Sequence, residues 1–100
     1  MTNINEMGIK QNVIEEIKGY ARQYGLTKVI VFGSRARGDY KEKSDIDLAV
    51  AGGDIIAFSL AVDEDTSTLL KFDIVNLDAS VQEELRQSIK QEGIVIYEEV

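Results

Sequence analysis

The chain has 100 residues, 44% of them apolar, which is enough for one globular domain and too little for a second catalytic domain. Its 11 basic and 18 acidic residues give a formal charge of −7, which argues against nucleic acid and anionic membranes as partners. Because cysteine and histidine are both absent, thiol nucleophiles, zinc–thiolate sites and imidazole bases are excluded, and any bound metal is expected to be a hard ion such as Mg²⁺.

Hydrophobic periodicity and turn residues predict helices and strands that follow one another along the chain. The predicted elements are, in order, a helix over residues 9–24 ended by Gly25, a strand over 27–32, a helical turn beginning near Ser34, a polar loop over 38–44, a strand over 45–50, a segment over 54–64, a strand over 70–77, a helix opened by a capping box of Ser80 and Glu83 and ending near 91, and an edge strand over 94–98.

This order implies an α+β fold in which helices pack on one face of a small mixed β-sheet. The segment 54–64 is compatible with a helix or a strand, and Asp54 as an N-cap favours the helix. The terminal strand could pair with a second copy in a homodimer, although its glutamates would equally protect that edge.

We expect neither a transmembrane helix nor a signal peptide in this sequence. The longest apolar stretch, residues 55–62, is far shorter than the roughly 20 residues of a transmembrane helix. The first 20 residues lack the basic start and apolar centre of a signal peptide. We therefore expect a cytoplasmic protein with one domain over residues 1–100, of which residues 1–8 are predicted to be flexible.

Two aspartates, Asp45 and Asp47, open the strand over residues 45–50. Residues two apart on a strand share a face, so their Cα atoms are expected roughly 6.5 Å apart. The two carboxylates repel one another, and a Mg²⁺ ion bound by both would relieve the repulsion. Asp73 interrupts the apolar strand "KFDIVN" and is the candidate third ligand of a two-metal site. The alternative is that Asp73 faces the surface and that Asp78 takes its place as the third metal ligand.

The residues before this pair suit a phosphate group. Gly33 permits close backbone approach, and Ser34 begins a helical turn whose free N–H groups and hydroxyl can bind an anion. Arg35 and Arg37 add fixed positive charge beside the turn, although Arg37 could instead pair with Asp39. The sequence therefore predicts a phosphate site and a metal site on neighbouring strands.

Two runs of this sequence resemble the signature of polymerase-β-like nucleotidyltransferases, in particular the minimal nucleotidyltransferases of prokaryotes. Residues 33–38, which begin with Gly33-Ser34 and end with Gly38, resemble the G-S-x-x-x-G part, and Ser44-Asp45-Ile46-Asp47 resembles the S-D-x-D part. The resemblance covers nearly the whole chain, including the leading helix, the "FDIV" strand and the closing "LRQSIKQEGIVIYE". It implies a polymerase-β-like fold and transfer of a nucleotide from an NTP. The implied site has two Mg²⁺ ions held by Asp45, Asp47 and Asp73, which are also the catalytic residues, and ATP held by Gly33, Ser34, Arg35, Arg37 and Ser44.

The resemblance also implies a partner. Minimal nucleotidyltransferases are commonly encoded beside a helical HEPN-domain toxin and act as its antitoxin, some by transferring AMP to a tyrosine of that toxin. One small domain leaves little room for both an ATP site and an acceptor site, which favours a protein acceptor. The alternatives are a non-catalytic module that masks a toxin surface, and a transferase acting on a small molecule or on RNA, of which the acidic surface disfavours RNA.

Overall fold

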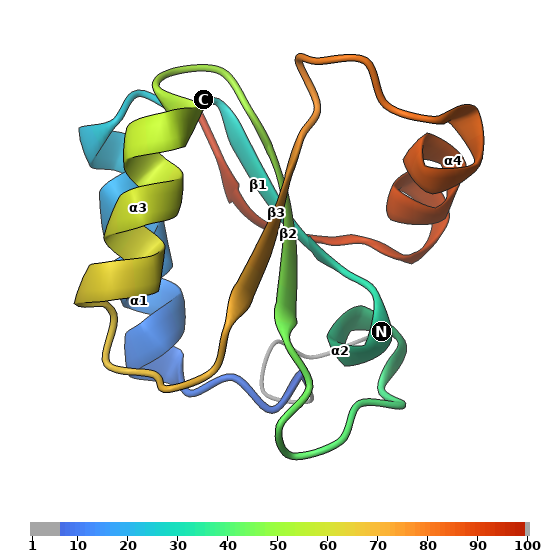
Figure 1. Ribbon diagram of the computed structural model, residues 1–100, viewed down its shortest axis with the longest axis horizontal. Coiled ribbons are helices and arrows are strands. Elements are labelled where there is room, and N and C mark those ends of the chain that lie inside the picture. Colours follow the sequence, from blue (N-terminus) through green and yellow to red (C-terminus); the bar gives the residue numbers. More distant parts are fainter. Residues whose placement is uncertain (1–6, 100) are drawn as a thin grey trace.

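The computed structural model describes residues 7–99 (Figure 1). Helices and strands follow in the predicted order, with shorter bounds at several ends. They are α1 (Gln11–Gln23), β1 (Lys28–Phe32), α2 (Ser34–Arg37), β2 (Ile46–Ala51), α3 (Ile55–Asp65), β3 (Phe72–Asn76), α4 (Glu83–Glu92) and β4 (Ile94–Glu98).

The strands form one mixed sheet in the spatial order β3-β2-β1-β4. The central strand β1 is antiparallel to β2 and to β4, whereas β2 is parallel to β3. The prediction of a small mixed sheet is therefore confirmed, and β4 is an edge strand as expected. Because β1 runs against β2 and β2 runs with β3, the last residue of β1 and the first residues of β2 and β3 lie at the same end of the sheet.

Helices α1 and α3 lie side by side against one face of this sheet (Figure 1). Alternate residues of each strand point toward them, since successive side chains on a strand face opposite sides. The side chains of Ile46, Leu48 and Val50 are fully buried on this face, so Asp47, between the first two, points to the opposite face. The helices contribute Val13, Ile14, Ile17, Ala21, Phe58 and Val62 to the same core.

Helix α4 lies on the other side of the sheet (Figure 1). Its side chain Ile89 is buried, and a Cβ on Gly93, directly after the helix, would collide with the side chain of Ile30. The predicted packing of helices on one face thus holds for α1 and α3 and differs for α4. The connection from β3 to β4 must cross from one sheet edge to the other, and α1 and α3 already fill the first face.

Two predicted helix caps have opposite outcomes. The carboxylate of Asp54 accepts a hydrogen bond from the backbone N–H of Ala57 at 3.1 Å, so the ambiguous segment is a helix. The capping box of Ser80 and Glu83 is wrong, because α4 begins at Glu83 and Gln82 is the N-cap residue without a side-chain bond. The turn after β3 occupies residues 77–79, and Gln82 is still extended.

The predicted flexible segment, residues 1–8, lies mostly outside the described residues. Within the described part, Met7 is fully buried in the core, and its carbonyl accepts a hydrogen bond from Arg35. Between residues 7 and 99, no helix is long and apolar enough to cross a membrane.

Candidate active site

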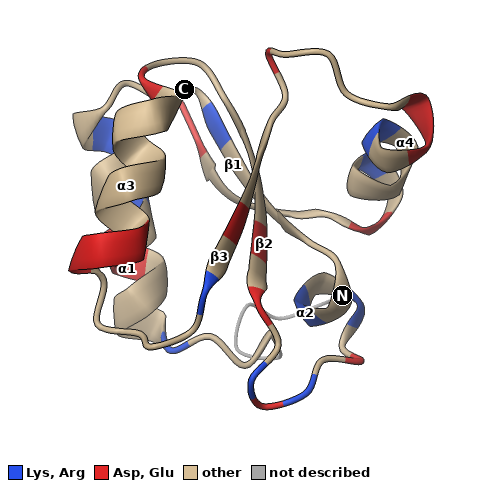
Figure 2. Ribbon diagram, in the orientation of Figure 1, with Lys and Arg blue, Asp and Glu red and all other residues tan. Residues whose placement is uncertain are grey.

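The candidate site lies where β1 ends and β2 and β3 begin. Asp47 is the register partner of Phe32 on β1 and of Asp73 on β3. Residues in register on adjacent strands point to the same face, and adjacent strands lie about 4.8 Å apart. The carboxylates of Asp47 and Asp73 therefore project side by side from the face opposite α1 and α3. Figure 2 shows these acidic positions next to each other on β2 and β3.

The phosphate turn lies directly against Asp47. Gly33, the residue after β1, has φ +74° and ψ −152°, a conformation that is nearly exclusive to glycine. A Cβ at this position would collide with the carboxylate of Asp47. Both the backbone conformation and the close approach thus require glycine, and they place the turn that begins α2 beside the acidic pair.

The electrostatics of the pair favour a cation. The pKa of Asp47 is raised, first by burial and then by the negative charges of Asp73 and Asp45, while Arg37 and Arg35 act in the opposite direction. Burial and the neighbouring negative charges both disfavour the ionised carboxylate, and a bound cation would offset both effects. Oxygen donors with uncompensated negative charge fit a hard divalent ion such as Mg²⁺.

Asp45 lies one residue before β2 and is exposed. It lines a cavity of about 420 Å³ together with Lys43, Leu69, Leu70 and Lys71. Among residues 7–99, no three carboxylates are gathered closely enough to form a complete metal-binding cluster. The sequence expectation of three aspartate ligands therefore stays a prediction, with the Asp47–Asp73 pair as its geometric basis.

The substitute ligand Asp78 is placed elsewhere. Its carboxylate accepts a hydrogen bond from the backbone N–H of Gly52 at 2.7 Å. Gly52 follows the far end of β2, so Asp78 lies at the opposite end of the strand from Asp45. This contact excludes Asp78 from the candidate metal site.

Arg35 does not present its guanidinium to the site in the way the sequence suggested. Its side chain is 2% exposed, and its N–H groups donate to the backbone carbonyls of Met7, Gly8, Glu42 and Ser44 at 2.9 to 3.2 Å. A guanidinium has five N–H donors, and five hydrogen bonds are formed. The structure thus contradicts the predicted phosphate contact of Arg35.

Arg37 lies on the exposed side of α2 and forms two ion pairs. Its Nε is 3.2 Å from the carboxylate of Asp39, and its Nη1 is 3.1 Å from that of Glu92 on α4. The pairing with Asp39 was the alternative for this residue, and the contact with Glu92 was not foreseen. The charge of Arg37 also lowers the pKa of Asp47, and the contact of Arg37 with phosphate stays a prediction.

The two serines differ in their surroundings. Ser34 begins α2 as expected, and its carbonyl accepts the N–H groups of Gly38 and Asp39. The hydroxyl of Ser44 accepts the N–H of Lys41 at 2.8 Å and so closes the loop that precedes β2. Ser44 is therefore engaged within its own loop, and its predicted contact with the nucleotide stays a prediction.

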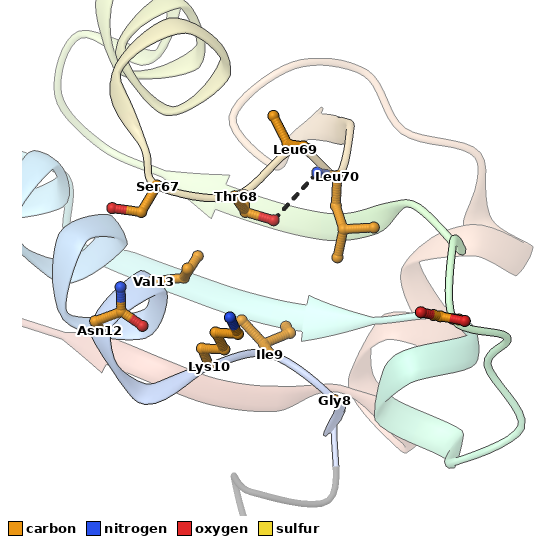
Figure 3. Close-up of a pocket in the computed structure, with 10 residues that line it drawn as sticks. Gly8, Ile9, Lys10, Asn12, Val13, Ser67, Thr68, Leu69 and Leu70 are labelled. Carbon is orange, nitrogen blue, oxygen red and sulfur yellow. Dashed lines mark hydrogen bonds between the residues drawn. The ribbon is translucent and has the colours of Figure 1, made fainter.

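A second cavity, of about 400 Å³, lies between the start of α1 and the loop joining α3 to β3 (Figure 3). Ile9 and Lys10 line it from one side and Leu69 and Leu70 from the other. Within the described part of the chain, its lining does not include Asp47 or the other predicted site residues. Sequence reasoning could not find this cavity, because its walls are brought together only by the fold.

Residues 15–100 match the family model described as polymerase beta, nucleotidyltransferase. A protein of Methanocaldococcus jannaschii named as a protein adenylyltransferase is 37% identical over 82 residues, which span 72% of this chain and 79% of that protein. The chain therefore belongs to the polymerase β nucleotidyltransferase family, and it is a nucleotidyltransferase.

Solved structures agree with this assignment. A structure described as a minimal nucleotidyltransferase has a TM-score of 0.64 and 31% identity, covering 81% of this chain and 86% of that one. A crystal structure of a toxin–antitoxin with AMP-PNP has a TM-score of 0.66 and 26% identity, covering 86% of this chain and 73% of that one. The predicted resemblance to the minimal nucleotidyltransferases is thereby confirmed, together with the fold.

Proposed function

We propose that this protein transfers AMP from ATP to a hydroxyl group of a partner protein in a Mg²⁺-dependent reaction. The observation that carries the proposal is the register of Asp47 and Asp73 on parallel strands, with the backbone of Gly33 against the Asp47 carboxylate. An acidic pair that can bind metal ions, beside a turn whose N–H groups can bind phosphate, suits metal-assisted nucleotidyl transfer.

In the proposed site, Asp47 and Asp73, joined by Asp45, would hold two Mg²⁺ ions, which supply positive charge to the triphosphate and to the attacking oxygen. Gly33 and Ser34 would bind the β- and γ-phosphates through the turn at the start of α2. The acceptor oxygen forms a bond to the α-phosphorus, the bond to the bridging oxygen breaks, and pyrophosphate leaves. The hydroxyl proton passes to the carboxylate of Asp73.

The partner that we propose is a helical HEPN-domain toxin, one of whose tyrosines accepts the AMP, so that the protein acts as an antitoxin in the cytoplasm. Two of the comparisons support this partner. One similar structure is a toxin–antitoxin with AMP-PNP, and one similar sequence is named as a protein adenylyltransferase. The net charge of −7 makes RNA a poorer acceptor than a protein.

The test uses the product of the neighbouring gene, incubated with this protein, ATP and Mg²⁺ and followed by intact mass. We expect the partner to gain one or more AMP units, and we expect Asp47→Ala to abolish the gain. The matched control is Asp63→Ala, which removes an exposed aspartate of α3 and should leave the gain unchanged. A stable complex with an unmodified partner would contradict the transfer and would instead favour a protein that masks the toxin surface.

A further inference from the structure

Arg35 is the single buried charged side chain among residues 7–99, with 2% of its surface exposed. No carboxylate hydrogen-bonds to it in this part of the chain. A buried charge is costly unless its hydrogen-bonding groups are satisfied, and here every partner is a backbone carbonyl. A buried guanidinium that has carbonyl partners but no carboxylate partner indicates a role that depends on the geometry of its N–H groups as well as on its charge.

The five hydrogen bonds join Arg35 to two other segments, residues 7–8 and residues 42–44. Arg35 itself lies on α2, directly after the turn of Gly33. It donates to Met7 and Gly8 at 3.0 and 3.1 Å, and to Glu42 at 3.2 Å. The guanidinium thereby ties the residues before α1 and the loop before β2 to the phosphate turn.

The strongest connection is to Ser44. Its carbonyl accepts two hydrogen bonds, from Nε at 3.1 Å and from Nη2 at 2.9 Å. This carbonyl belongs to the peptide group that joins Ser44 to Asp45. On the other side of Asp45, the N–H of Ile46 donates to the carbonyl of Lys71 at 2.8 Å. Asp45 is therefore held between two backbone anchors, one made by Arg35 and one made by the residue before β3.

An aromatic ring completes the arrangement. The ring of Tyr40 lies over the guanidinium, with its centroid 4.7 Å from the Arg35 Cζ atom. A Cβ on Gly8, whose φ is +69°, would collide with the same ring. Tyr40 thus packs between Gly8 and Arg35 and excludes water from the guanidinium.

We propose that Arg35 is a positioning residue, which fixes the Ser44–Asp45 peptide group and thereby holds the backbone from which the Asp45 carboxylate can reach a metal ion bound by Asp47 and Asp73. This inference rests on the proposed function. Lysine retains the charge but has three donors on one atom, so it cannot reach both Ser44 and the carbonyls of residues 7 and 8. The role therefore requires the arginine fork.

The experiment measures binding of Mn²⁺, by electron paramagnetic resonance of the free ion, to the wild type, to Arg35→Lys and to the control Arg22→Lys on the exposed side of α1. Outer groups that orient metal ligands typically contribute about 10- to 100-fold to metal affinity. We expect Arg35→Lys to bind Mn²⁺ weaker by about that factor, while its affinity for a fluorescent ATP analogue in EDTA is retained. Arg22→Lys is expected to match the wild type in both assays.

The outcomes separate the two proposals. If the wild type binds no Mn²⁺, the proposed function fails and this inference fails with it. If the wild type binds Mn²⁺ and Arg35→Lys binds it equally well, the proposed function stands and the inference is overturned. Loss of ATP-analogue affinity in EDTA, without loss of Mn²⁺ affinity, would make Arg35 a phosphate ligand and would also overturn the inference.

A measurement on the wild type decides the question if Arg35→Lys does not fold. The Nε–H of Arg35 should give a slowly exchanging signal in ¹⁵N NMR spectra, because it is buried and bonded to Ser44. Addition of ATP in EDTA should leave this signal in place, and addition of Mg²⁺ should shift the Asp45 amide signal. A large shift of the Nε–H signal on addition of ATP alone would contradict the positioning role.

Discussion

Replacement of Gly33 by alanine tests the contact between the phosphate turn and Asp47. The backbone of Gly33, with φ +74° and ψ −152°, lies in a region where a side chain costs about 1 to 3 kcal/mol. The added Cβ would also collide with the Asp47 carboxylate, and the distance to its Cγ would be 3.2 Å. We therefore expect Gly33→Ala to lower stability and, separately, to move a catalytic group.

Two other glycines separate these effects. Gly38 has φ +90° but open space around its Cα, so Gly38→Ala should lose about 1 to 2 kcal/mol through the backbone alone. Gly19 lies in α1 with a negative φ and nothing within 4 Å, so Gly19→Ala should gain about 0.5 to 1 kcal/mol. Urea denaturation measures all three changes in the free energy of unfolding.

The rate of AMP transfer to the partner provides the second assay. A displacement of about 1 Å in a catalytic group can lower a rate on the order of 100-fold. We expect a loss of that size for Gly33→Ala and no loss for Gly19→Ala. If Gly33→Ala loses no more rate than Gly38→Ala, the reasoning about contact with Asp47 is refuted.

Three further predictions concern charge and capping. Burial and neighbouring carboxylates raise the pKa of the Asp47 side chain, so the folded state binds its proton more tightly than the unfolded state does. The free energy of unfolding therefore falls as the pH rises from the unfolded-state pKa of about 3.9 through the raised pKa of the folded state. Asp47→Asn should therefore be more stable than the wild type at pH 7 in EDTA, as measured by urea denaturation, and equal stability would contradict the charge argument. Replacing either partner of the exposed Arg37–Glu92 ion pair should lower the melting temperature at low salt. The decrease should be smaller in 0.5 M NaCl, where the Debye length is roughly 4 Å. A decrease that does not depend on salt would count against an ion pair. Asp54→Ala removes the N-cap of α3 and should cost about 1 kcal/mol of stability with no change in transfer rate, whereas an unchanged stability would show that the cap contributes nothing.

Local patterns were sufficient for much of the fold. The spacing of apolar residues predicted α1, the β-branched runs predicted β1 and β3, and Asp54 indicated the start of α3. The side of the sheet on which α4 lies was not predictable, because it depends on which face the other helices have already covered. The capping box failed for a similar reason, since the turn after β3 delays the start of α4.

The candidate site was also predictable from the sequence only in part. The aspartate pair and the glycine turn were visible because each is a short motif. The placement of Asp73 beside Asp47 depends on a register between strands that are 26 residues apart in the sequence, which no local pattern encodes. Arg35 was assigned to phosphate from its residue type and its position beside the Gly33-Ser34 turn, and its actual partners are backbone carbonyls, which leave no trace in the sequence.

The most direct test of the central claim is the location of the metal. Trace Mn²⁺ added to ¹⁵N-labelled protein broadens amide signals close to the ion. The account predicts that the first signals to broaden belong to Gly33, Asp47 and Asp73, which lie together where β1 ends and β2 and β3 begin. Broadening that begins instead at the exposed acidic residues of α3 or α4, with these three signals unchanged, would contradict the account.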